Sequence, residues 1–158
     1  MIRLFLAVIG LGFFAMAACA GDEKADELKK FQGLWRIVQM NTGDGGSATI
    51  PKRDLARMAV EFRGNTLTRD EKGEKQQSTF IIDPAKKPKT IEWIMAFKTP
   101  EGEKGKLVEE KATILGIYSL EGNQLKLCLS NSLDEKAARP KEFRPARGII
   151  LMILEKSK

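Results

Sequence analysis

The side chains that perform most enzyme chemistry are absent or scattered in this sequence. It contains no histidine, which removes Ser-His-Asp and Cys-His nucleophiles, histidine-containing zinc sites and the commonest general base. Glu109 and Glu110 are adjacent, so in an extended segment they point to opposite faces and cannot form a facing carboxylate pair. Glu61, Asp83 and Glu92 are far apart along the chain, and no loop is acidic enough to bind a metal through oxygen ligands. We therefore expect no enzymatic activity, no catalytic residues, no metal site and no cofactor.

A cysteine and two basic stretches are the other candidates for chemistry. Cys128 has neither a base nor a metal partner nearby in sequence, so a buried, inert thiol is expected. Residues 83–89 are better explained as a proline-stiffened turn than as an anion clamp. Residues 136–147 could contact anionic lipid heads or wall polymers of the cell envelope, or could form a solvated loop. The cations of this segment are Lys136, Arg139, Lys141, Arg144 and Arg147. Its only aromatic residue is Phe143, so we expect no nucleic-acid partner.

Residues 1–20 have the pattern of an export signal. A basic residue, Arg3, precedes an apolar block at residues 4–16 and then small residues. The block is too short to span a bilayer comfortably, which makes a permanent transmembrane helix the weaker interpretation. Cleavage before Gly21 gives a secreted protein, whereas the lipobox-like residues 16–19 give a lipoprotein anchored through a lipidated Cys19. Both alternatives predict an extracytoplasmic protein, periplasmic, secreted or anchored in the envelope, which contacts a membrane only through Cys19.

The remaining residues, 21–158, are predicted to form one domain. Removing 20 of 158 residues leaves 138, enough for one core of ordinary size and too few for two domains. The formal charge of +6 falls to +5 with the loss of Arg3, so the mature chain is only modestly basic. With Cys19 removed or lipidated, Cys128 has no disulfide partner. Packing must therefore stabilise the fold.

Short stretches rich in apolar and β-branched residues dominate this domain, each bounded by glycine, proline, asparagine or charge. Eight strands are predicted, at residues 34–40, 58–62, 66–69, 78–82, 90–97, 112–120, 124–129 and 149–154. The Gly-Asn pairs at 64–65 and 122–123 are typical of tight hairpins with positive φ, so successive strands should pair antiparallel. Helix is limited to residues 22–31 and one turn at 52–57.

The strand pattern favours an all-β fold, a single antiparallel up-and-down β-barrel with a short N-terminal helix. Closure removes the exposed edges that an open sheet of eight strands would leave. A sandwich of two sheets is the alternative. Strict alternation within the strands predicts which side chains face the interior. These inward residues are the candidates for ligand binding: Trp35, Ile37, Val60, Phe62, Phe80, Ile82, Ile91, Trp93, Met95, Leu125 and Leu127.

The stretch FQGLWRIV, residues 31–38, resembles the Gly-x-Trp start of the first strand of lipocalins, in which the tryptophan plugs one end of the barrel. The matching residues are Gly33 and Trp35. A large ring fills volume that converging strands leave empty, and a glycine lets the incoming chain pass close beneath it. The resemblance also implies a basic side chain over the indole, here Lys156 or Arg147.

Further motifs resemble an uncharacterised family of secreted, lipocalin-like domains that recurs in planctomycete bacteria. They are DPAKKPKTIEW at 83–93, LGIYSLEGNQLKLC at 115–128 and RPKEF at 139–143. The resemblance covers nearly the whole mature chain, although Asn123 stands where an aspartate is expected and Trp93 is bulkier than the usual residue. It implies a lipocalin-like barrel and brings no catalytic residues with it.

A non-enzymatic binding module for a small apolar or amphipathic ligand is the leading functional hypothesis. The interior of an eight-stranded barrel is either just filled by side chains or just wide enough for one small ligand. The alternative is a structural or protein-interaction domain of the envelope, with a filled barrel and a functional surface. A measurable internal cavity separates the two hypotheses.

Overall fold

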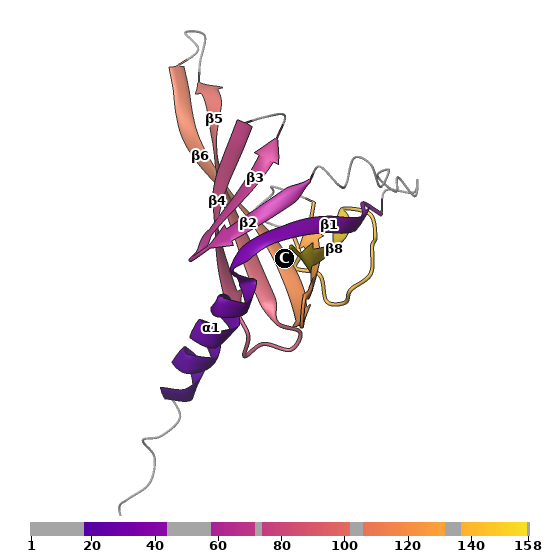
Figure 1. Ribbon diagram of the computed structural model, residues 1–158. Coiled ribbons are helices and arrows are strands. Elements are labelled where there is room, and N and C mark those ends of the chain that lie inside the picture. The colour runs from indigo at the N-terminus through magenta and orange to yellow at the C-terminus, as the bar shows by residue number, and fades with distance from the viewer. Residues whose placement is uncertain (1–17, 44–57, 72–73, 102–105, 132–136, 158) are drawn as a thin grey trace, which may run out of the picture.

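The computed structural model describes residues 18–43, 58–71, 74–101, 106–131 and 137–157 (Figure 1). One helix, α1 (Ala18–Phe31), is followed by eight strands. The strands are β1 (Gly33–Asn41), β2 (Ala59–Arg63), β3 (Thr66–Glu71), β4 (Glu74–Asp83), β5 (Thr90–Glu101), β6 (Lys106–Glu121), β7 (Gln124–Ser130) and β8 (Ile149–Lys156). Most of the predicted export signal and the predicted helical turn at 52–57 lie outside the described residues.

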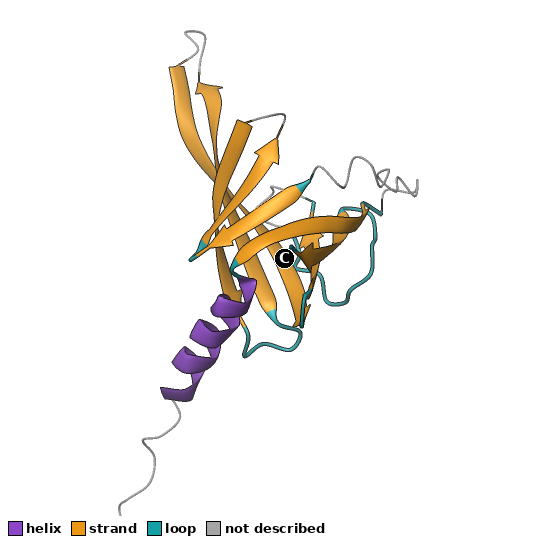
Figure 2. Ribbon diagram, in the orientation of Figure 1, coloured by secondary structure: helices purple, strands orange, loops and turns teal. Residues whose placement is uncertain are grey.

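The eight strands form a closed antiparallel barrel of lipocalin-like architecture. Each strand pairs with its neighbours in sequence, and β8 returns to pair with β1, which closes the ring (Figure 2). This confirms the predicted up-and-down barrel over the sandwich. The predicted helix and all eight predicted strands are present, but the helix begins four residues earlier, and several strands are longer than predicted, above all β4, β5 and β6. Their extra residues are largely polar and extend the hairpins beyond the barrel wall, where no apolar alternation marks them (Figure 1).

The two Gly-Asn turns have the expected geometry. Gly64 has a φ of 55° and Gly122 a φ of 57°, values in the left-handed region that favours glycine. Each turn joins strands that pair directly, β2 with β3 and β6 with β7. Both tight antiparallel hairpins are therefore present as the sequence predicted.

Aromatic side chains seal one end of the barrel. Trp35, Phe62, Phe80 and Tyr118 point inward from four strands, and each is at most 1% exposed. Phe31, the last residue of α1, inserts among them, with ring centroids 5.5 Å from Phe62, 5.6 Å from Phe80 and 5.1 Å from Tyr118. The Trp35 indole nitrogen donates a hydrogen bond of 2.6 Å to the Phe31 carbonyl. Trp35 thus closes this end together with the helix, not alone.

The first and last strands meet around Trp35. Lys156 lies over the indole, 5.4 Å from the ring centroid, and its ammonium group donates to the Lys30 carbonyl at 3.1 Å. Of the two cations expected here, the structure places Lys156, whereas Arg147 is exposed in the turn before β8. Gly33 has a φ of 110°, and a Cβ there would make only an ordinary contact of 3.5 Å with Lys156. The glycine is therefore needed for its backbone conformation, and not for the close passage of the chain that we expected.

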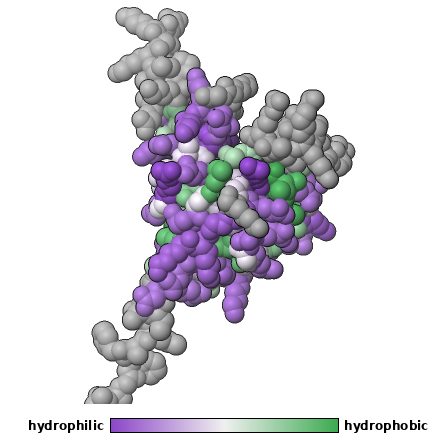
Figure 3. Space-filling view, in the orientation of Figure 1, coloured by the Kyte–Doolittle hydropathy of each residue, from purple (hydrophilic) through white to green (hydrophobic). Residues whose placement is uncertain are grey.

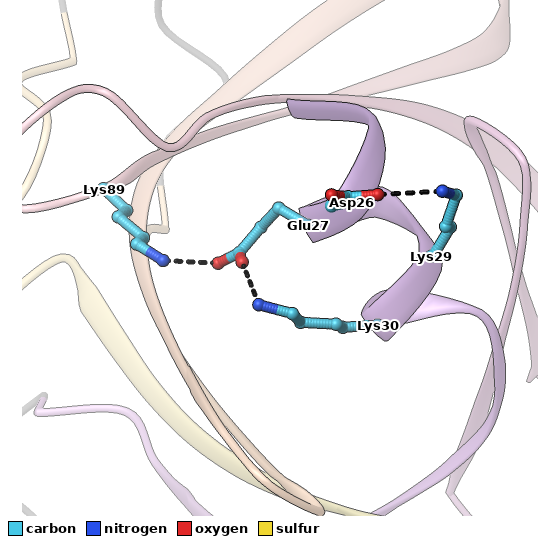
Figure 4. A network of polar contacts seen from close by, with 5 residues as sticks. All are labelled: Asp26, Glu27, Lys29, Lys30 and Lys89. Carbon is cyan, nitrogen blue, oxygen red and sulfur yellow. Dashed lines mark hydrogen bonds and ion pairs between the residues drawn. The ribbon is translucent and has the colours of Figure 1, made fainter. Parts of the chain in front are cut away.

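A buried carboxylate attaches α1 to the same end of the barrel (Figure 4). Glu27 is 4% exposed and accepts hydrogen bonds from Lys89 at 2.6 Å and from Lys30 at 3.1 Å. Burial acts to raise the pKa of Glu27, but the two hydrogen bonds and the lysine charges together outweigh it, so the pKa lies below its ordinary value. Burial, and then the charge of Glu27, raise the pKa of Tyr118. The turn at 83–89 is present as predicted, and Lys89 at its end has the additional role of binding Glu27 on α1.

Residues 137–147 cover part of the outside of the barrel. Arg139 donates to the carbonyls of Ile91 and Gly116, at 2.9 and 2.6 Å, and to the Glu92 carboxylate at 2.9 Å. Cys128 lies beneath the same segment, fully buried, and its thiol donates to the Glu142 carbonyl at 3.4 Å. Burial is also the main cause that raises the pKa of this thiol. The thiol is buried as expected.

Candidate functional site

An internal cavity of about 420 Å³ occupies the end of the barrel opposite the aromatic cluster. Phe62, Leu67 and Leu154 line its inner part, and each is at most 1% exposed. The parts of the strands that lie farthest from the aromatic cluster form the walls, toward the open end of the barrel. The lining of these walls is mostly apolar. The volume lies within the range of about 300–1,000 Å³ found for pockets that hold small molecules. The barrel is therefore filled at one end and hollow at the other.

A bulge in β1 shapes one wall of this cavity. The pairing of β1 with β8 shifts register between Ile37 and Gln39. Ile37 and Met40 both line the cavity although they are three residues apart, while Val38 between them is 39% exposed. A bulge inserts one residue and so reverses the alternation of faces beyond it. Simple alternation along β1 would have turned Met40 outward.

The predicted ligand-binding residues divide between the two ends of the barrel. Six line the cavity: Ile37, Val60, Phe62, Trp93, Met95 and Leu127. The other five pack toward the closed end, each at most 1% exposed: Trp35, Phe80, Ile82, Ile91 and Leu125. All of them face inward, as alternation predicts. Alternation fixes the face of a strand on which a residue lies, but it carries no information on depth along the barrel axis.

Sequence reasoning missed several side chains of the cavity wall. The methionines that were not predicted are Met40, Met58 and Met152, and four polar residues at the open end were also missed. The polar residues are Arg69, Asp70, Ser130 and Asn131. Met40 could not be predicted because the bulge reverses the alternation before it. The polar residues lie at or near strand ends, where the sequence pattern is that of ordinary turn or surface positions. A cavity with an apolar wall and a polar rim suits an amphipathic molecule better than a purely apolar one.

Trp93 is held in a defined position in the cavity wall. Its indole nitrogen donates a hydrogen bond to the Ser78 hydroxyl, and the Arg69 guanidinium lies 6.0 Å from the ring centroid. The side chain is 7% exposed, and it is the only tryptophan of the two that lines the cavity. The ring forms part of the cavity lining. The fluorescence of Trp93 is therefore sensitive to changes in the environment of the cavity.

The carboxylates considered above do not converge in the part of the chain that the structure describes. Glu61 pairs with Arg63 at 2.7 Å, and Glu92 pairs with Arg139 on the outside of the barrel. Asp83 accepts a hydrogen bond from the Ala85 amide within its turn. Among the described residues, no group of three or more histidine, cysteine, aspartate or glutamate side chains could hold a metal ion.

The basic segment is partly neutralised by its own neighbourhood. Arg139 pairs with Glu92 at 2.9 Å and Arg144 with Glu142 at 3.0 Å. Lys136 lies outside the described residues. Figure 3 shows a surface that is largely hydrophilic, α1 included, with hydrophobic residues in limited patches over the barrel. The internal cavity is thus a better defined site than this exposed segment.

No protein-family model, no curated protein and no solved structure matches the chain. Within the described residues, the helix is neither long nor apolar enough to cross a membrane. Both predicted cleavage points, before Cys19 and before Gly21, fall in the first turn of α1.

Proposed function

We propose that the protein is an exported, non-enzymatic binding module that holds one small apolar or amphipathic ligand inside its barrel. The observation that supports this most strongly is the cavity of about 420 Å³, which is closed by aromatic rings at one end and reaches the polar rim at the other. An envelope domain with a filled barrel needs no such space. The proposal includes the export signal at residues 1–20. It holds both for a secreted protein and for one anchored through a lipidated Cys19.

The shape of the cavity suggests how a ligand lies in it. An apolar portion fits against Phe62, Leu67 and Leu154, and a polar end group can reach Arg69 or Asp70 at the rim. Burial of apolar surface contributes roughly 25 cal/mol per Å², so a short hydrocarbon chain has enough contact area for measurable affinity. The direction of insertion follows from the closed end, because the aromatic cluster blocks entry there.

A titration followed by tryptophan fluorescence tests the proposal. The Trp35→Phe variant leaves Trp93 as the only tryptophan, and a panel of fatty acids, isoprenoids and environment-sensitive dyes is added to it. We expect at least one compound to shift the Trp93 emission and to raise the melting temperature. If no compound does either, the envelope-interaction hypothesis replaces the binding module.

A further inference from the structure

All four methionines of residues 21–158 line the cavity. The chain has six methionines, two of which lie in the predicted export signal. The others are Met40, Met58, Met95 and Met152. Isoleucine, in contrast, is distributed between the cavity, the closed end and the outer surface, as Ile37, Ile82 and Ile81 illustrate. The thioether side chains are therefore gathered in one place, while another large apolar residue type is not.

Three of these methionines come from one stretch of the barrel wall, on β1, on β8 and just before β2. Met40 on β1 is directly opposite Met152 on β8. Met58 immediately precedes β2, and its carbonyl accepts a hydrogen bond of 3.1 Å from the Ile37 amide. Met58 is thus opposite Ile37, which precedes the bulge, and Met40 follows the bulge on the same wall of the cavity. Opposed residues such as Met40 and Met152 have Cβ atoms about 5 Å apart, within reach of long side chains.

The three side chains also span the depth of the wall near the open end. Met58 is 36% exposed, Met40 is half-buried and Met152 is 7% exposed. Exposure thus decreases from Met58 through Met40 to Met152. Met95 lies on β5, which is four strands from β1 in either direction around the closed barrel. It is the natural internal control for the other three.

Thioether sulfur is a soft ligand that selects soft metal ions, Cu(I) above all, and it binds hard ions such as Mg²⁺ or Ca²⁺ poorly. It carries no proton to lose, so a site built from it needs no deprotonation. Arg69 and Asp70 on β3 carry opposite charges, so together they add no net charge to the rim that would repel a cation. We propose that Met40, Met58 and Met152 bind a soft monovalent metal ion of the Cu(I) type at the open end of the cavity. Oxygen, nitrogen and thiolate ligands do not converge in the sequence pattern, whereas the thioethers are brought to one cavity only by the fold.

The test uses Ag(I), which has the same charge and softness as Cu(I) and does not change oxidation state in air. The full chain carries Cys19→Ser, so that no accessible thiol competes, and it is kept in mild detergent. Its methionine methyl groups are labelled with carbon-13, and each signal is assigned from a Met→Leu variant. Leucine conserves volume, so these variants should fold, which circular dichroism and the melting temperature verify. Met1 and Met16 remain in every variant and form a constant background.

We expect one equivalent of Ag(I) to shift the methyl signals of Met40, Met58 and Met152 and to leave that of Met95 unchanged. Changes around a metal ligand already cost about 10–100-fold in affinity, so Met40→Leu, Met58→Leu and Met152→Leu should each weaken Ag(I) binding at least tenfold. Met95→Leu should not. The site is overturned if none of the three signals responds, or if Met95→Leu weakens binding as much as the others. Dye binding by the triple Met→Leu variant tests the apolar ligand proposal separately, because it requires the cavity and not the sulfur atoms.

Discussion

At the scale of single residues, Trp35 connects the helix, the first strand and the last strand. Its ring is fully buried, its indole nitrogen is bonded to Phe31 and Lys156 covers its face. Truncation of a large buried aromatic residue leaves a cavity and usually costs about 3–5 kcal/mol. We expect Trp35→Ala to lower the free energy of unfolding in urea by that amount. A loss below about 1 kcal/mol would show that the ring is not part of the core.

Glu27 makes the stability of the protein depend on pH. Its pKa in the folded state is below the ordinary value of 4.5, so its stabilising effect is complete above that pH and is lost as the pH falls through the folded value. Glu27→Gln should therefore be less stable than the wild type near neutral pH, by about 1–2 kcal/mol because the lysine partners are partly solvated. The difference should shrink below pH 4.5.

Urea unfolding of both proteins at a series of pH values measures this effect. Asp26→Asn is the matched control, because Asp26 pairs with Lys29 on the exposed side of the same helix. It should change stability little at any pH. A difference between wild type and Glu27→Gln that stays constant down to pH 2 would contradict the role assigned to the carboxylate.

At the scale of elements, Arg139 fastens residues 137–147 over the outer wall of the barrel. Its three hydrogen bonds reach both β5 and β6, and Cys128 is buried beneath the segment. We expect Arg139→Met to loosen this cover and to accelerate labelling of the Cys128 thiol by about tenfold, the effect of roughly 1.4 kcal/mol in the opening equilibrium. A thiol reagent added to the Cys19→Ser chain measures the rate.

The control for this experiment is Arg147→Met, a change at an exposed arginine outside that hydrogen-bond group. Its labelling rate should equal that of the wild type. If Arg139→Met and Arg147→Met label Cys128 equally slowly, the covering segment does not depend on Arg139.

Elements were the scale at which the sequence was most informative. The alternation in residues 124–129 predicted the inward face of β7, and the Gly-Asn turns predicted its hairpin with β6. The same alternation could not show that Leu125 lies in the filled end and Leu127 beside the cavity, because depth in a barrel depends on strand tilt and on all eight registers together. Alternation along β1 could not predict that Met40 lines the cavity, because a bulge leaves no reliable mark in one sequence.

At the scale of the whole molecule, the export signal can be tested directly. Expressed in a bacterium that processes lipoproteins, the chain should lose its first 18 or 20 residues. Mass spectrometry of the N-terminus then distinguishes a diacylglyceryl Cys19 from an unmodified Gly21. Recovery of a cytoplasmic product that still begins at Met1 would contradict export.

The central claim is that the space inside the open half of the barrel takes up a ligand, and filling that space tests it most directly. Val60 is 6% exposed and lines the cavity, whereas Val38 is 39% exposed on the outside of β1. In Val60→Trp the new ring should enter the empty volume, so the melting temperature should hold and the affinity for an environment-sensitive dye, followed by the emission of the dye itself, should fall at least tenfold. Val38→Trp should bind the dye as the wild type does. Equal dye affinity in Val60→Trp and Val38→Trp, with both variants folded, would place the bound molecule outside the cavity and contradict the claim.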